Sequence, residues 1–456
     1  MLKTGWDKLA EGERQPQLPL QLEAPQLQLQ QWLRVLPGKR YVAKALLNDS
    51  LVLVKLFLGG RAQKKVEAEI AGSQALAERN LPTPELLASG VSGNRGWVVY
   101  QWLDQAITLQ QLAGISVEGL SSKHQRCPES VLQVAELIAR MHDGGLIQQD
   151  LHPGNFIFAS GQWWVVDAAD VVLSAEAEAK KQNLAVFLAQ IPPVWVSDVL
   201  NKLESSESDH DDVVAMAHKW RAWRALDLAR KSLRDCTLFQ VNQTVRGFSS
   251  GWRDGVAIPS DWDTLLEQGE RLKDGGSATV GLIEYGQQKL VLKRYNLKNW
   301  RHWLKRFWRP TRAWHSWFVG HRLRVLGVPT PKPLVMAEER FGPLRGRGFL
   351  LSQQAPGDDI LVACKDAEST RAVAADIAAM LKIFIREKIS HGDFKGTNLL
   401  WDGQLHLIDL DAVQWHRDHG KWRKAFGKDI SRLLRNWPEG SEQHRVMSEM
   451  IKELHF

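Results

Sequence analysis

The stretch HGDFKGTNLL at residues 391–400, followed by LIDLDA at 407–412, is the segment that decides the fold. An earlier copy of the same pattern reads QQDLHPGNFIF at 148–158 and VVDAAD at 165–170. In each copy an aspartate precedes an asparagine by five residues, and another aspartate comes eleven or twelve residues after that asparagine. Phosphoryl transfer from ATP needs an acidic group to orient the attacking hydroxyl and two oxygen ligands for Mg²⁺. The repeat therefore predicts two phosphoryl-transfer sites.

Turn formation is the alternative explanation for these loops. DLHPGN and DFKGTN are rich in turn residues, and Asp and Asn are common in turns. However, Asp167 and Asp409 each follow a short apolar strand that would return beside the loop. A metal ligand at that place would lie against the asparagine. Because both halves carry the complete set, we favour metal-nucleotide chemistry.

Length and composition indicate a soluble globular protein with more than one domain. The chain has 456 residues, of which 44% are hydrophobic and 24% are charged, and this length exceeds one ordinary core. The internal repeat favours two domains. Gly, Ser and Pro collect at 245–261, so we expect domains at 1–250 and 251–456.

Cysteine usage and hydropathy indicate a reducing, cytoplasmic location. Three cysteines lie far apart in the sequence and form no disulfide framework or CxxC metal spacing. The first residues lack the apolar core of a signal peptide, and no stretch approaches the length of an apolar membrane span.

The charge of the chain suggests an anionic partner. The net charge is +7, and residues 289–324 contain eleven Lys or Arg, five Trp and no acidic residue. Within this stretch aromatic and basic residues fall on different sides of a helical projection, which is typical of a helix on an anionic membrane surface. Alternatively, the tryptophans belong to the core and the basic residues form a solvated face. Stacking on nucleic acid is a third reading, and we expect no nucleic-acid partner.

The same order of elements is predicted in each half. The first half has a strand at 50–58, a helix at 61–79, a strand at 96–103 and a helix at 129–145. The counterparts are a strand at 289–295, a helix ending before 329, a strand at 348–354 and a helix from 371. Each half thus places strands and a helix first and mostly helices later.

A lysine lies on an apolar face of the first strong strand in each half. Lys55 and Lys293 alternate with hydrophobic residues, so each ammonium group needs a partner, and a nucleotide phosphate with a helix carboxylate would supply it. Lysines on an edge strand could instead reach water. Glu69 is the candidate carboxylate for Lys55. The equivalent offset in the second half gives Ser316, which cannot pair with a lysine as a charge.

These motifs resemble the protein-kinase-like superfamily, in the branch that includes lipopolysaccharide core, aminoglycoside and choline kinases. HGDFKGTNLL with LIDLDA, KLVLKRYN and LGVPTPKPL are especially similar to the bacterial lipopolysaccharide core (Kdo and heptose) kinase family. The resemblance covers most of residues 30–190 and 270–435. It implies an α+β fold with two tandem protein-kinase-like domains, each with a small β-rich N-lobe and a mostly helical C-lobe.

The resemblance also implies a role for each motif residue. Asp150 and Asp393 would be catalytic bases, and Lys55 and Lys293 would anchor the phosphates of ATP, with Glu69 holding Lys55. The implied Mg²⁺ ligands are Asn155, Asp167, Asn398 and Asp409.

Several positions depart from the family pattern. His391 lies two residues before Asp393, but Gln148 takes that place in the first half. Ala168 and Leu410 replace the glycine that usually follows the second aspartate. No GxGxxG covers the phosphates. The candidate phosphate loops are residues 37–39 and Gly275-Gly276-Ser277, of which the second is better because two glycines admit close backbone N–H groups.

We therefore expect an ATP- and Mg²⁺-dependent phosphotransferase that acts on a sugar hydroxyl of a lipopolysaccharide core glycolipid at the cytoplasmic face of the inner membrane. No long insert follows the second aspartate, which argues against a protein substrate held by an activation segment. In one alternative, one half is a pseudokinase or scaffold that regulates the other. In another, the protein is a soluble small-molecule kinase, in which the basic tryptophan-rich stretch has no role.

Overall fold

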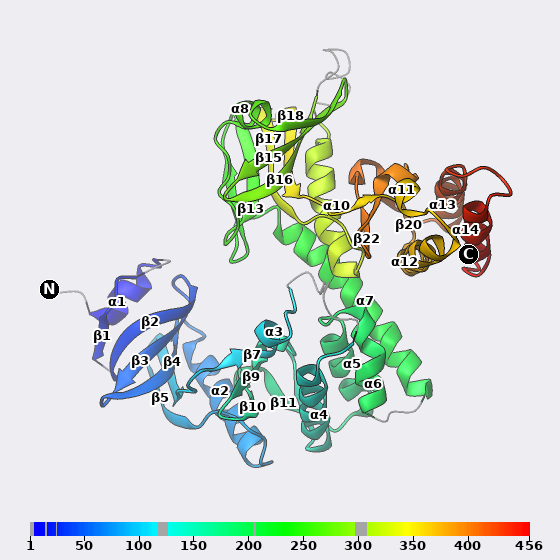
Figure 1. Cartoon of the computed structure of the whole chain (residues 1–456). Coiled ribbons are helices and arrows are strands. Elements are labelled where there is room, and N and C mark those ends of the chain that lie inside the picture. Colours follow the sequence, from blue (N-terminus) through cyan, green and yellow to red (C-terminus); the bar gives the residue numbers. More distant parts are fainter. Residues whose placement is uncertain (1–3, 14–15, 24, 117–125, 204–206, 297–307) are drawn as a thin grey trace. The chain divides into compact units, whose positions relative to one another are not determined.

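The chain folds into two compact units that combine sheet and helix (Figure 1). The computed structural model describes residues 4–13, 16–23, 25–116, 126–203, 207–296 and 308–456. The first unit extends to Trp220, and the second runs from Arg221 to Phe456. The mixed helix-and-sheet class is as predicted. Among the described residues, no helix has both the length and the apolar character that crossing a bilayer requires.

The first unit begins with a six-stranded antiparallel sheet in the order β1-β2-β3-β4-β6-β5. One face of β4 packs with helix α1 (Gly5–Ala10), where Val54 and Leu56 join Trp6 and Leu9 in a buried cluster. The opposite face carries Lys55 toward helix α2 (Ala62–Ala77). The strands are β1 (Leu20–Glu23), β2 (Gln26–Leu36), β3 (Arg40–Leu47), β4 (Ser50–Leu58), β5 (Leu86–Ser92) and β6 (Arg95–Gln101).

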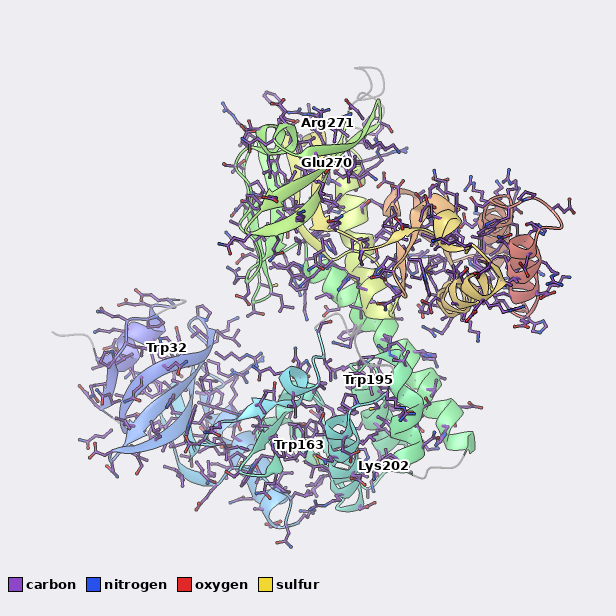
Figure 2. The ribbon with its side chains drawn as sticks, viewed as in Figure 1. Trp32, Trp163, Trp195, Lys202, Glu270 and Arg271 are labelled. Atoms are coloured by element: carbon purple, nitrogen blue, oxygen red, sulfur yellow. The ribbon has the colours of Figure 1, made fainter. Side chains whose placement is uncertain are left out.

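The remainder of the first unit is mostly helical, with short strands that carry the motif loop. Trp163 and Trp195, labelled in Figure 2, belong to its buried core. Its helices are α3 (Leu109–Leu112), α4 (Glu129–Asp143), α5 (Ala177–Leu188), α6 (Val196–Lys202) and α7 (Glu207–Lys231), which continues into the second unit. Its strands are β7 (Ile107–Thr108), β8 (Leu146–Gln148), β9 (Phe156–Ala159), β10 (Gln162–Val165) and β11 (Val171–Leu173).

The second unit opens with a seven-stranded antiparallel sheet in the order β12-β13-β17-β18-β16-β15-β14. Its strands are β12 (Phe239–Gln243), β13 (Gly247–Trp252), β14 (Glu270–Gly275), whose first two residues are labelled in Figure 2, β15 (Ala278–Tyr285), β16 (Gln288–Tyr295), β17 (Pro333–Phe341) and β18 (Leu344–Gln353). Helices α8 (Trp262–Glu267) and α10 (Arg312–Leu326) accompany the sheet.

The rest of the second unit repeats the pattern of helices with short strands. Its helices are α11 (Ile360–Ala363), α12 (Ala367–Glu387), α13 (His419–Leu434) and α14 (Glu442–Lys452). Its strands are β19 (Asp358–Asp359), β20 (Ile389–Ser390), β21 (Leu399–Trp401), β22 (Leu405–Leu407) and β23 (Gln414–Trp415). The core of this unit includes Trp317, Phe384, Phe394 and Phe426, all with less than 2% of their surface exposed.

The Gly- and Ser-rich segment that suggested a domain boundary forms part of the second sheet. The expected boundary after residue 250 falls inside β13, which pairs with both β12 and β17. Phe248 is buried in the core, and the Ser250 hydroxyl donates a hydrogen bond to the Ser232 carbonyl. We therefore propose that the second domain begins within α7, before β12.

Candidate active sites in the two units

The lysine of the first unit is held by two carboxylates. Lys55 Nζ lies 2.6 Å from Glu69 Oε1 and 2.9 Å from Asp167 Oδ1. Glu69 is completely buried and also accepts a 2.9 Å hydrogen bond from the Tyr100 hydroxyl. Burial and the Glu69 charge raise the pKa of Tyr100, so this hydroxyl stays protonated and can donate. The strand lysine, the helix glutamate and the second aspartate thus meet at one point.

A close approach of helix α2 to the motif turn makes this meeting possible. Gly72 lies one turn beyond Glu69, and a Cβ atom there would be 1.8 Å from the carbonyl oxygen of Ala168. Only glycine allows the helix to come this near. Ala168 opens the 3₁₀ helix η2 (Ala168–Asp170), and Asp167 just before it has a φ of 63°. Asp167 therefore has the left-handed backbone conformation. The residue after it is Ala168, where the family pattern has a glycine.

The loop of the first unit ties its three motif residues together. The Asn155 side-chain amide donates to the Asp150 carbonyl at 2.8 Å, and the Val166 N–H donates to the Asn155 carbonyl at 2.9 Å. Asn155 is thereby bonded both to Asp150 and to the residue just before Asp167. Burial alone would raise the pKa of Asp167, but the charges of nearby cations, first among them Lys55, outweigh it and lower that pKa. Asp167 is therefore ionised at neutral pH.

The lysine of the second unit has a different pair of carboxylates. Lys293 Nζ lies 2.6 Å from Asp409 Oδ1 and 3.1 Å from Asp411 Oδ1. The hydroxyls of Tyr295 and Ser316 donate to Asp411 at 2.7 and 2.9 Å. Ser316 therefore holds the partner of Lys293, and Asp411 takes the place of the missing glutamate. Asp411, which follows Asp409 by two residues in LIDLDA, was not among the site residues predicted from the sequence.

The loop of the second unit repeats the geometry of the first. The Asn398 side-chain amide donates to the Asp393 carbonyl at 2.9 Å, and the Ile408 N–H donates to the Asn398 carbonyl at 2.9 Å. Asp409 has a φ of 60°, as Asp167 has 63°. Burial opposes ionisation of Asp409, but the charge of Lys293 and other cations lowers its pKa. Lys395 adds a cation 2.9 Å from Asp393 Oδ2.

Gln148 and His391 each contact the backbone carbonyl of the residue just before the second aspartate, Asp167 or Asp409. The Gln148 amide donates to the Val166 carbonyl at 2.8 Å, and His391 Nε2 lies 3.2 Å from the Ile408 carbonyl. Burial lowers the pKa of His391, so the neutral ring donates from Nε2 and accepts the Asp393 N–H at Nδ1, 3.3 Å away. The first unit therefore keeps this support without a histidine.

We predict that His391→Gln costs less stability than His391→Ala. Glutamine can restore the hydrogen bond to the Ile408 carbonyl, whereas alanine leaves a buried carbonyl without a donor, at about 1–3 kcal/mol. Denaturant unfolding of both variants measures the difference. Equal losses for the two variants would show that the contact shared with Gln148 does not stabilise the loop.

Helices behind each loop anchor its backbone with polar side chains that the sequence analysis also missed. In the second unit Asp429 of α13 accepts the His391 N–H at 2.6 Å and the Gly392 N–H at 3.0 Å. In the first unit Asn183 of α5 donates to the Gln148 carbonyl at 2.7 Å, and Gln190 donates to the Leu151 carbonyl. Each of these hydrogen bonds is made to a backbone group of the loop.

In each unit the lysine, the asparagine and the second aspartate of the motif border a cavity, whereas Asp150 and Asp393 are not among the residues that line it. In the second unit a cavity of about 630 Å³ is lined by Lys293, Asn398, Asp409, Asp411 and Lys273, among others. In the first unit Lys55, Asn155 and Asp167 are among the residues that line a cavity of about 390 Å³. The predicted phosphate glycines Gly275 and Gly276 are at the β14–β15 turn and do not line the second cavity, whereas Ser277 and Ala278 do.

The donor sets suit Mg²⁺ that arrives with a nucleotide. In the described ranges no three His, Cys, Asp or Glu side chains form a metal cluster. Mg²⁺ usually takes only one or two protein carboxylates together with phosphate oxygens, so such a cluster is not required. Asp409 is ionised, and the Asn398 amide oxygen has the hard-donor chemistry that Mg²⁺ prefers. Asp167 and Asn155 offer the same pair in the first unit.

Comparison with known proteins gives matches to lipopolysaccharide kinases. Residues 267–450, all within the second unit, match the model of the lipopolysaccharide kinase (Kdo/WaaP) family. The 3-deoxy-D-manno-octulosonic acid kinases of Xylella fastidiosa strains M12 and 9a5c are each 26% identical, over 43% of this chain and 86% of their own length. A solved structure titled "WaaP in complex with acyl carrier protein" is 18% identical, with a TM-score of 0.30, over 42% of this chain and 90% of that chain.

Proposed function

We infer that this protein, a kinase that belongs to the lipopolysaccharide kinase (Kdo/WaaP) family through residues 267–450, transfers the γ-phosphate of ATP to a sugar hydroxyl of the lipopolysaccharide core. The observation that carries the proposal is the meeting of Lys293, Asn398 and Asp409 at one cavity, with Asp393 held beside them. The relatives named above are kinases of 3-deoxy-D-manno-octulosonic acid, so we propose a core sugar of this type as the acceptor.

Each residue of the second unit has a part in the proposed transfer. Lys293 contacts the phosphates of ATP, and Asp409 with Asn398 would hold the Mg²⁺ bound to them. Mg²⁺ supplies charge that offsets the negative charge of the phosphates. Asp393 accepts the proton of the sugar hydroxyl as its oxygen bonds to the γ-phosphorus. The bond from that phosphorus to the β–γ bridging oxygen breaks, and ADP leaves.

We also propose that residues 289–324 contact the anionic cytoplasmic face of the inner membrane. Residues 297–307, with most of the predicted amphipathic helix, lie outside the described residues. Trp317 is fully buried and Trp314 packs against Phe248, so these two tryptophans belong to the core, whereas Trp308 is 58% exposed. Sedimentation with anionic vesicles should fall when Arg301, Lys305, Arg306 and Arg309 are changed to Gln. Equal sedimentation with neutral vesicles would remove this part of the proposal.

Acceptor choice tests the function. The full chain with Mg²⁺ and γ-labelled ATP should label a glycolipid that ends in 3-deoxy-D-manno-octulosonic acid in preference to one that ends in heptose, and chelation of Mg²⁺ should abolish labelling. Labelling of aminoglycoside or choline alone would support the soluble small-molecule kinase instead. No labelling of any acceptor would contradict the phosphotransferase proposal.

A further inference from the structure

We propose that two neighbouring hairpin turns of the second unit form a hairpin tip that docks on a membrane and inserts apolar side chains among anionic lipid headgroups. The hairpin tip consists of Val245 and Arg246, between β12 and β13, and of residues 341–344, where β17 turns into β18. None of these residues lines either motif cavity or belongs to segment 289–324. The inference deepens the membrane contact proposed above and rests on that proposed function for the presence of a bilayer.

The two turns of the hairpin tip are bonded side by side. The Gly342 N–H donates to the Val245 carbonyl, and the Arg340 N–H donates to the Arg246 carbonyl, each at 2.9 Å. These bonds extend the pairing of β13 with β17 beyond the start of β13. The hairpin tip is therefore a continuation of the sheet, and it holds the side chains of both turns at one place on the surface.

The hairpin tip carries the most exposed large apolar side chains in the described part of the chain. Phe341 is 79% exposed and Val245 is 73% exposed, and Pro343 beside them is exposed as well. Single exposed apolar residues are common on protein surfaces. Here, however, the two most exposed ones come from different hairpins and adjoin each other. Because removing apolar surface from water is favourable, this arrangement indicates a partner that covers both side chains together.

Arginines surround the apolar part of the hairpin tip. Arg246 is exposed in the first turn, and Arg340 and Arg345 stand at the base of the second. These two arginines share one fully buried carboxylate, that of Glu338, at 3.0 and 3.1 Å. Arg345 also lies 4.9 Å over the ring of Trp314, which fixes its position. Three arginines against one glutamate leave an excess of positive charge, which attracts anionic headgroups.

The neighbouring carboxylates on the same sheet are already offset by cations. Glu339 lies 2.5 Å from Arg347. Asp263 lies 2.7 Å from Arg294 and 2.9 Å from Arg347. These two acidic and two basic side chains balance each other, so they do not cancel the positive charge of the hairpin tip.

The hairpin tip lies at the end of the sheet where the chain enters and leaves the segment already proposed to contact the membrane. Strand β16 ends at Tyr295, opposite Gly348 of β18. Thr311, which caps the start of α10, donates its N–H and its hydroxyl to Glu338 at 3.1 and 2.6 Å. One continuous anionic surface can contact the hairpin tip and the neighbouring basic segment together. This continuity favours a bilayer over a protein as the partner.

Partition of the full chain onto lipid vesicles tests the inference. One set of vesicles contains phosphatidylcholine alone, and the other contains phosphatidylcholine and anionic phosphatidylglycerol in equal parts. Phe341→Ser/Val245→Ser should weaken binding to the anionic vesicles by about 10- to 100-fold, because both side chains lose the gain from leaving water. Arg246→Gln should weaken binding by about 5-fold, and only on the anionic vesicles.

Matched controls remove similar groups elsewhere. Leu173 and Val194 of the first unit are 69% and 60% exposed, so Leu173→Ser/Val194→Ser removes comparable apolar surface and should leave partition unchanged. Arg417→Gln removes an exposed charge of the second unit and should also have no effect. In the wild type, bound anionic vesicles should slow amide hydrogen exchange in residues 341–344. Circular dichroism shows whether each variant is folded.

Two results would overturn the inference. Wild-type partition in the folded serine variant would leave the basic segment as the membrane contact, and no binding of the wild type to either vesicle would point to a protein partner instead. Phosphate transfer to a soluble core oligosaccharide needs no bilayer, so it should be unchanged in the hairpin-tip variants. Absence of that transfer in the wild type would contradict the proposed phosphotransferase without altering vesicle partition, so the two proposals fail separately.

Discussion

We expect Asp393→Asn to lower the rate of phosphate transfer to the proposed core acceptor by about two to four orders of magnitude, the range that a positioned base contributes. The amide has the shape of the carboxylate and can still accept the Asn398 amide hydrogen bond, but it cannot take the proton of the sugar hydroxyl. Initial rates at saturating ATP measure the loss. Nucleotide binding should persist, because Lys293, Asn398 and Asp409 remain in place.

Asp254→Asn is the matched control for this prediction. It makes the same chemical change at an exposed position of the second unit, and we expect no loss of transfer. Asp150→Asn adds a diagnostic arm in the first unit. If Asp150→Asn abolished transfer while Asp393→Asn did not, catalysis would belong to the first unit and our assignment would be wrong.

Glu69→Ala is expected to destabilise the first unit by about 1.5–3 kcal/mol, because it removes the closer of the two carboxylates that hold the Lys55 ammonium group and leaves only Asp167 as its partner. Lys55 has only 11% of its side chain exposed, and Glu69 is its closest carboxylate, at 2.6 Å. The Tyr100 hydroxyl would lose its acceptor as well. Denaturant unfolding, followed with probes that separate the transitions of the two units, measures the change in the free energy of unfolding.

Glu67→Ala provides the control for this change in the same helix. Glu67 is exposed, and its side chain accepts a hydrogen bond only from Gln63 among the residues described. Its loss should alter the free energy of unfolding by no more than about 0.5 kcal/mol. If Glu69→Ala had an equally small effect, the pair with Lys55 would not hold the first unit together.

Local sequence patterns were sufficient to predict the elements that carry the sites. The strand at 50–58 is β4 with the same bounds, and the helix expected at 61–79 is α2. The alternation of residues along 50–58 predicted a strand, and it predicted that Lys55 lies on an apolar face of that strand. Distance along α2 singled out Glu69, because helical geometry is regular enough to relate spacing to a face. The repeated Asp/Asn/Asp spacing located both motif loops.

Long-range replacements could not be predicted in this way. Asp411 pairs with Lys293 from a distant part of the chain, so a search limited to the helix position found only Ser316. Gln148 makes the contact of His391 through an amide N–H, which a search for histidine misses. Segment 245–261 was wrong as an interdomain linker because pairing with β17 outweighs the weak strand propensity of Gly and Ser.

The product of the reaction tests the central claim most directly. The full chain should be incubated with Mg²⁺, ATP and a glycolipid that ends in 3-deoxy-D-manno-octulosonic acid, and the product analysed by ³¹P NMR. We predict one new phosphomonoester signal coupled to a sugar proton, with one ADP released per phosphate transferred. Inorganic phosphate with an unmodified glycolipid would contradict the claim that this kinase phosphorylates a core sugar.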